Sequence, residues 1–118
     1  MSEHLAVDTD GPVRILTMTG RPRRGNPLSR ALAGDLVQAL MAAEGDEAIH
    51  AVVVAGTASH FSVGADLTEV HELRAIEAVL GDWLEEFDRF AAARKPTIAA
   101  VRGHAVGGGF ELALSCDL

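Results

Sequence analysis

Apolar residues along the chain fall into short continuous runs that are typical of strands. Residues 13–19 are apolar and β-branched and predict a strand, with residues 5–8 as an antiparallel partner across a turn at 10–12. The runs 51–55 and 98–101 are apolar without interruption, which is typical of strands that are buried on both faces. The pattern therefore predicts a sheet with buried strands in its middle.

Two other segments have helical spacing. Leucines recur every fourth residue from Leu32 to Leu40, after Ser29 as a candidate N-cap, and Gly45 would end this helix. Between residues 76 and 91 the apolar side chains follow i, i+3, i+4 and i+7 spacing and include Trp83, Phe87 and Phe90, which we interpret as a core or subunit-contact stripe.

Strands that alternate with helices predict an α/β architecture, and 118 residues fit a single domain. Two strand–helix units, 51–70 and 97–116, share a plan: a buried strand, a loop with glycine, and a helix start with an acidic residue nearby. This shared plan suggests that the two loops carry the function.

Composition excludes several classes of protein. The net charge of −7 argues against a general nucleic-acid binder, and no run is long enough to predict a membrane span. The N-terminus shows no apolar signal core, and the single cysteine fits a reducing compartment, so we expect a cytoplasmic protein. The five histidines are scattered, so no metal site is predicted. Cys116 is expected to be a small buried residue rather than a nucleophile.

The chemistry points to residues 107–111, where three glycines precede Glu111 at a predicted helix start. Glycines there expose backbone N–H groups at the positive end of the helix dipole, which suits a polarised carbonyl oxygen. Gly64-Ala65 occupies the same place in the other loop. Two N–H donors converging on one point would form an oxyanion hole, in which each donor typically contributes about 10²–10³ in rate. Taken alone, the glycines could equally serve tight helix–strand packing. Neither common nucleotide-binding glycine pattern is present.

Three ordered motifs resemble those of the enoyl-CoA hydratase/isomerase (crotonase) family. Residues 61–67, Phe-Ser-Val-Gly-Ala-Asp-Leu, resemble its F-x-x-G-A-D-[LI] signature. Residues 96–112 resemble P-x-[IV]-A-A-V-x-G-x-A-x-G-G-G-x-E-L, and residues 21–29 resemble the earlier R-P-x-x-x-N-A-L-S segment. The resemblance covers essentially the whole chain in the right order.

The resemblance implies roles for individual residues. Ala65 and Gly108 would supply the two N–H groups that hold the thioester oxygen, and Glu111 would act as acid/base on the water that adds to the double bond. In a largely apolar pocket such a carboxylate would have a raised pKa. Arg23 or Arg24 would face the coenzyme A phosphates. The remaining coenzyme A contacts, partly through backbone, would come from Ser62, Val63, Gly64, Ala65, Asp66, Leu67, Gly107 and Gly108. His104 is expected to pack rather than to catalyse.

The resemblance also implies the ClpP/crotonase ββα spiral as the fold, an acyl-CoA or enoyl-CoA substrate of the kind met in fatty acid β-oxidation, no cofactor, and a homotrimer or hexamer for an intact family member. Family members are much longer than this chain, so we expect residues 1–118 to be the N-terminal part of one incomplete crotonase-like domain. The second catalytic acid of hydratases has no counterpart here. Hydration is the favoured activity because isomerases often lack a carboxylate at the position of Glu111. An enoyl-CoA isomerase, and a non-catalytic coenzyme A-binding or interaction fragment, stay open as alternatives.

Overall fold

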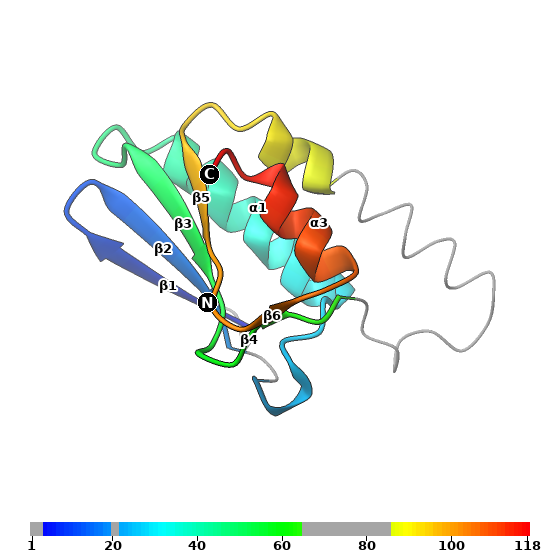
Figure 1. The fold of residues 1–118 in the computed structure, drawn as a ribbon. Helices are drawn as coiled ribbons and strands as arrows, with labels where there is room; N and C mark the ends of the chain where they lie inside the picture. Colours follow the sequence, from blue (N-terminus) through cyan, green and yellow to red (C-terminus); the bar gives the residue numbers. More distant parts are fainter. Residues whose placement is uncertain (1–3, 20–21, 65–85) are drawn as a thin grey trace.

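The computed structural model describes residues 4–19, 22–64 and 86–118. These residues form two sheets and a layer of helices (Figure 1). The larger sheet has the strand order β1-β2-β3-β5, and the smaller one pairs β4 with β6. The strands are β1 (Leu5–Asp10), β2 (Val13–Met18), β3 (Ala51–Ala55), β4 (His60–Ser62), β5 (Thr97–Ala100) and β6 (His104–Ala105). The helices are η1 (Pro22–Arg24), α1 (Arg30–Glu44) and α3 (Gly108–Ser115).

The larger sheet confirms the predicted strands. β1 and β2 form an antiparallel hairpin whose register runs from Leu5 opposite Met18 to Asp10 opposite Val13, with Gly11 in the turn at a φ of +57°. β2 pairs with β3 in parallel, and β3 pairs with β5 in parallel. The crossover from β2 to β3 carries α1, and the crossover from β3 to β5 carries the first glycine loop and the helical residues 86–91, as expected of an α/β fold.

Helix α1 begins and ends where the sequence predicts. The Oγ of Ser29 accepts a hydrogen bond from the N–H of Leu32 at 3.1 Å, and Gly45 is the C-cap residue. At the other end, the ammonium of Lys95 donates to the carbonyls of Ala43 and Asp46, at 2.8 and 2.6 Å. A cation there complements the negative end of the helix dipole.

The sheet buries only one of its faces within the described residues. Leu16 and Val54 have no exposed surface and belong to the core together with the leucines of α1. Val53, on the opposite face, is only half-buried and is not part of that core. The prediction that residues 51–55 are buried on both faces is therefore wrong for this part of the chain. The physical reason is that α1 packs on one face and α3 lies beside α1 (Figure 1).

The C-terminal residues run along the edge of β5 that does not pair with β3. The N–H of Leu118 donates to the Thr97 carbonyl at 3.1 Å, and the N–H of Ala99 donates to the Leu118 carbonyl at 2.8 Å. These two bonds flank Ile98 in the manner of a parallel bridge. The side of β5 away from β3 is therefore already engaged in strand-like pairing.

The helix predicted for residues 76–91 is described only at its end. Residues 86–91 are helical, and Phe90 is buried in the core, which confirms the apolar stripe at this position. Trp83 and the rest of the predicted helix lie outside the described residues.

Candidate functional site

The two glycine loops singled out from the sequence lie side by side (Figure 1). Strands β4 and β6 pair in parallel with His60 opposite His104. The pairing continues on both sides, because the N–H of His104 donates to the Ser59 carbonyl at 3.0 Å and the N–H of Val106 donates to the Ser62 carbonyl at 3.1 Å. Residues far apart in the sequence thus form one surface at the start of α3.

Gly64 and the start of α3 approach each other closely. Gly64 has a φ of +92°, which side chains other than glycine rarely adopt. A Cβ at this position would lie 2.8 Å from the Gly108 nitrogen and 3.1 Å from the Val106 carbonyl oxygen. The backbone of one loop therefore meets the helix start of the other where the sequence predicted two converging small residues.

Gly108 offers a free donor at this meeting point. The N–H groups of the next residues are used inside the helix start, since Gly109 donates to the Val106 carbonyl at 2.9 Å and Glu111 to the Gly107 carbonyl at 3.1 Å. Among the described residues, the Gly108 N–H has no acceptor. Gly107, the N-cap residue, has a φ of +53° and provides no side-chain cap. As far as the described residues extend, the positive end of α3 is thus open to an external oxygen.

Glu111 lies in the first turn of α3, as predicted, and its side chain is exposed. The apolar pocket expected around its carboxylate is not formed by the described residues. Its neighbour Leu112 is buried in the core, so the helix is anchored on its inner face while Glu111 stays accessible.

Ala65, Asp66 and Leu67, predicted to contribute a donor and coenzyme A contacts, lie outside the described residues. The residue that precedes them is well fixed, because the Gly64 carbonyl accepts a hydrogen bond from the Leu28 N–H at 2.6 Å. The role of Ala65 as second donor stays a prediction.

The other predicted contact residues differ in accessibility. Ser62 is fully buried, and its Oγ donates to the Asn26 carbonyl at 2.8 Å and accepts from the Gly64 N–H at 3.1 Å. Its hydroxyl therefore serves the loop itself. Val63 is half-buried, while Arg23 and Arg24 in η1 are exposed. These two guanidinium groups are available to an anion in solution.

Asn26 lies inside the motif of residues 21–29, but the sequence alone predicts no role for it. Asn26 is 1% exposed and has a φ of +52°. The available signal was an asparagine directly after Gly25 in an otherwise basic loop, since asparagine tolerates the left-handed conformation. Only its tertiary partners, which come from β4, reveal what it holds.

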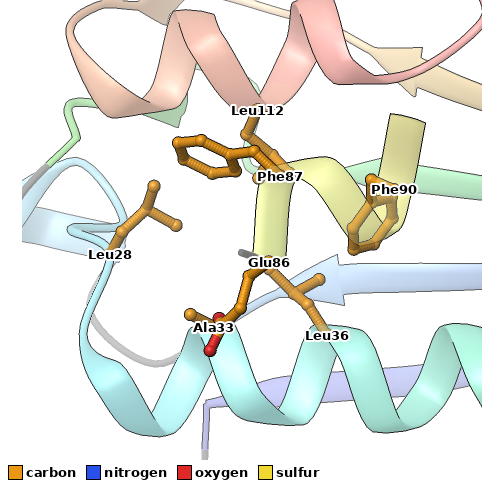
Figure 2. Close-up of a pocket in the computed structure, with 7 residues that line it drawn as sticks. All are labelled: Leu28, Ala33, Leu36, Glu86, Phe87, Phe90 and Leu112. Atoms are coloured by element: carbon orange, nitrogen blue, oxygen red, sulfur yellow. The ribbon is translucent and has the colours of Figure 1, made fainter. Parts of the chain in front are cut away.

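A small apolar cavity lies between α1, residues 86–91 and α3 (Figure 2). Its volume is about 10 Å³, enough for roughly one water molecule, so it is a packing gap rather than a substrate pocket. The Glu86 carboxylate points toward Ala33 at its edge (Figure 2). The lining residues are Leu28, Ala33, Leu36, Glu86, Phe87, Phe90 and Leu112.

Cys116 and His104 are both expected from the sequence to pack within the structure rather than to react. Cys116 is buried, as predicted, and burial raises the pKa of its thiol to about 11, which disfavours the reactive thiolate form. His104 is exposed, and its ring centroid lies 5.1 Å from that of His60. None of the helices in the described ranges has the length and apolar character of a membrane span.

The α/β framework brings a glycine loop against a helix start that carries a carboxylate in its first turn. Proteins of this class can bind a carbonyl oxygen next to an acid/base. Residues 10–118 match the sequence model of the family described as enoyl-CoA hydratase/isomerase. The chain belongs to this family.

Individual relatives agree with this assignment. The chain is 44% identical over 115 residues to a protein of Rhizobium meliloti named "Probable enoyl-CoA hydratase", covering 98% of this chain and 44% of the relative. It is 44% identical over 119 residues to the 2,3-dehydroadipyl-CoA hydratase of Escherichia coli, covering 100% of this chain and 46% of the relative. The chain thus spans less than half the length of these curated relatives.

Solved structures show the same fold. The crystal structure of an enoyl-CoA hydratase from Bacillus anthracis superposes with a TM-score of 0.91 at 28% sequence identity, covering 98% of this chain and 46% of that one. The predicted fold is therefore confirmed as a mixed α/β crotonase fold of which this chain matches about half.

Proposed function

We propose that the protein hydrates a 2-enoyl-CoA thioester and that the backbone N–H groups of Ala65 and Gly108 hold the thioester oxygen. The observation that carries this proposal is the Gly108 N–H at the start of α3, which lies directly against Gly64 and has no acceptor within residues 4–19, 22–64 and 86–118. Preorganised backbone donors lower the energy of a transition state in which charge builds up on an oxygen. The names of the relatives, which include hydratases of CoA thioesters, support the same reaction.

The chemistry requires an acid/base close to these donors. In hydration, the oxygen of water bonds to the β-carbon of the enoyl group while electron density moves to the thioester oxygen. One carboxyl group can carry both proton transfers, taking a proton from the water and returning a proton to the α-carbon, so that one water is added in total. Glu111 is proposed to take the proton from water, because it is accessible in the same helix turn as the Gly108 donor.

Coenzyme A would be bound along the neighbouring loop. Arg23 and Arg24 are exposed and precede Gly25, whose carbonyl accepts a hydrogen bond from the Val63 N–H at 2.9 Å. Their charges therefore lie next to the 62–64 segment, where phosphate groups would be attracted. Replacing both arginines by alanine is expected to raise KM for the thioester at least about threefold while kcat stays within twofold, because phosphate contacts bind ground and transition states alike.

Hydration of crotonyl-CoA, followed by loss of the enoyl absorbance, tests the proposal. The expected effect of Glu111→Gln is a fall in kcat of about 10²–10⁴, the usual contribution of a general acid/base. Glu47→Gln is the matched control, because Glu47 is exposed and lies in the turn after α1. Equal rates for the parent and Glu111→Gln would show that the role given to Glu111 is wrong.

Two alternatives, an isomerase and a non-catalytic coenzyme A-binding protein, can be distinguished from the hydratase by experiment. The family also contains isomerases, so the reaction product is to be identified: a 3-hydroxyacyl-CoA supports the hydratase, and a moved double bond supports the isomerase. A non-catalytic protein would bind coenzyme A in a calorimetric titration without turning over any enoyl-CoA. An assembly of three or six subunits and a cytoplasmic location stay predictions from the family resemblance.

A further inference from the structure

We propose that Asn26 is a positioning residue that fixes the geometry between the two loops of the oxyanion site. This inference rests on the proposed function, because it assigns Asn26 a part in setting the donors that would hold the thioester oxygen. Asn26 lies on neither glycine loop and is not expected to touch the substrate. It would act through the strand β4 and through Ser62.

The backbone of Asn26 has an uncommon conformation. Among the described residues, Asn26 is the only one other than glycine with a positive φ, at 52°. Its side chain is buried, with 1% of the residue exposed. Asparagine pays less than most residues for the left-handed region, yet burying its amide is costly unless hydrogen bonds compensate. The position therefore requires both this conformation and partners for the amide.

The partners come from three consecutive residues of β4. The Nδ2 of Asn26 donates to the carbonyls of His60 and Phe61, at 3.2 and 3.4 Å. The carbonyl of Asn26 accepts from the Ser62 Oγ at 2.8 Å. Asn26 thus forms a hydrogen bond with each of the three residues of β4, and this strand ends two residues before Gly64.

Ser62 extends this hold to both loops. Its Oγ accepts a hydrogen bond from the Gly64 N–H at 3.1 Å, and its carbonyl accepts one from the Val106 N–H at 3.1 Å. Gly64 is the residue before the predicted donor Ala65, and Val106 lies two residues before the donor Gly108. Two successive hydrogen bonds through Ser62 therefore connect Asn26 to Gly64, and two connect it to Val106. These residues lie on the two sides of the predicted oxyanion site.

One polar atom of Asn26 lowers the stability of the fold. The Oδ1 of Asn26 is buried and has no hydrogen-bond partner in the part of the chain that the structure describes. An unsatisfied buried polar atom typically costs about 1–3 kcal/mol. Such costs gather at functional sites, where geometry matters more than stability.

The test compares Asn26→Asp and Asn26→Gly with the parent protein. Asp keeps the size of the side chain and tolerates the positive φ but cannot donate to the two carbonyls. Gly keeps the φ at no steric cost and removes the side chain. Both variants are expected to speed amide hydrogen exchange at Gly64 and Val106 at least tenfold, measured by NMR without ligand. In crotonyl-CoA hydration, both are expected to lower kcat at least tenfold and to change KM less than threefold.

Thr97→Val is the control for general loss of stability. Thr97 is also fully buried and uses its hydroxyl within the protein, but its partner Asp117 lies at the β5 edge. This variant is expected to leave exchange at Gly64 and Val106 within threefold of the parent. Equal acceleration in Thr97→Val would overturn the positioning role, and so would unchanged exchange in either Asn26 variant.

The exchange measurement separates this inference from the proposed function. If the parent protein hydrates no enoyl-CoA, the proposed function fails, while accelerated exchange in the Asn26 variants still supports Asn26 as the residue that fixes the two loops. If the parent is active and either Asn26 variant keeps its kcat, the positioning role is wrong although the proposed function stands.

Discussion

Gly64 and Gly108 meet backbone to backbone: a Cβ on Gly64 would lie 2.8 Å from the Gly108 nitrogen. They belong to loops separated by more than forty residues of sequence, and each loop follows a strand of the same parallel pairing. Glycine at position 64 thus serves two purposes, a positive φ and the room for the neighbouring helix start. This contact is what turns two ordinary glycine loops into one candidate site.

Substituting Gly64 by alanine is expected to damage the site more than the fold. The positive φ alone costs roughly 1–2 kcal/mol, and the added methyl group has to push the Gly108 backbone away. We expect hydration of crotonyl-CoA to fall about 10²-fold, the effect of losing one oxyanion donor, while the far-UV circular dichroism spectrum is kept.

Gly34→Ala is the matched control for this substitution. Gly34 lies within α1, and a Cβ there would meet nothing within 4 Å. Alanine in a helix interior is expected to raise the free energy of unfolding by about 0.5–1 kcal/mol and to leave the rate unchanged. A Gly64→Ala protein as active as the Gly34→Ala protein would contradict the proposed contact.

The carboxylate of Glu44 is expected to make stability depend on pH. Burial alone would raise its pKa, but hydrogen bonds from the Arg94 N–H and the Arg89 guanidinium, together with their charges, hold the pKa below its usual value. A depressed folded-state pKa contributes stability above the pKa of the unfolded chain, and this contribution is lost as pH falls through the folded-state value.

Urea unfolding of Glu44→Gln measures this contribution. At pH 7 the substitution is expected to lower the free energy of unfolding by about 1–2 kcal/mol, because charge-assisted hydrogen bonds are lost. The difference in the free energy of unfolding between Glu44→Gln and the parent should shrink as the pH is lowered below the usual range of carboxyl pKa values. Glu47→Gln, at an exposed position, should change stability by less than about 0.5 kcal/mol at either pH. A deficit in Glu44→Gln that persists unchanged in acid would refute the ionic contribution.

The single thiol provides a test of core packing. Because burial raises the pKa of Cys116 to about 11, little thiolate exists at pH 8. We expect the native protein to react with a chromogenic disulfide reagent at least about 10² times more slowly than the urea-unfolded protein. Comparable rates in the two states would mean that Cys116 is accessible in the native protein.

Lys95 binds backbone carbonyls at the C-terminal end of α1. Lys95 donates to two carbonyls there, so Lys95→Met keeps much of the apolar stem and removes the donors. We expect a loss of about 1–2 kcal/mol in urea unfolding. Arg102→Met, at an exposed position after β5, is the control and should change the free energy of unfolding by less than about 0.5 kcal/mol. An equal loss in both variants would argue against capping by Lys95.

Local patterns predicted much of this structure because their causes are local. Ser29 and Gly45 bound α1 as their capping preferences require, and Gly11 closes the β1–β2 hairpin. The burial of β3 could not be predicted as well, because an apolar run such as 51–55 does not reveal whether both faces will be covered. Val53 is only half-buried since the described helices pack on the other face.

The sequence predicted those features of the site that have local causes and missed those that depend on distant contacts. Glycines next to Glu111 signal an open helix start through the backbone alone, and the structure has that start at Gly108. The contribution of Asn26 depends on β4, which lies 34 residues further along the chain at His60. No periodicity or short motif encodes such a distant contact. Likewise, the motif could suggest a substrate contact for Ser62 but not that its hydroxyl is consumed inside the protein.

Binding of a thioester carbonyl oxygen by the Gly108 N–H can be observed in the NMR signal of that amide. A titration with a non-reactive acyl-CoA thioester is compared with a coenzyme A thioether of the same chain length that lacks the carbonyl oxygen. If the Gly108 N–H binds this oxygen, its amide proton moves downfield with the thioester and stays within experimental error with the thioether. An unchanged Gly108 signal on saturation with the thioester, or equal shifts with both ligands, would contradict it.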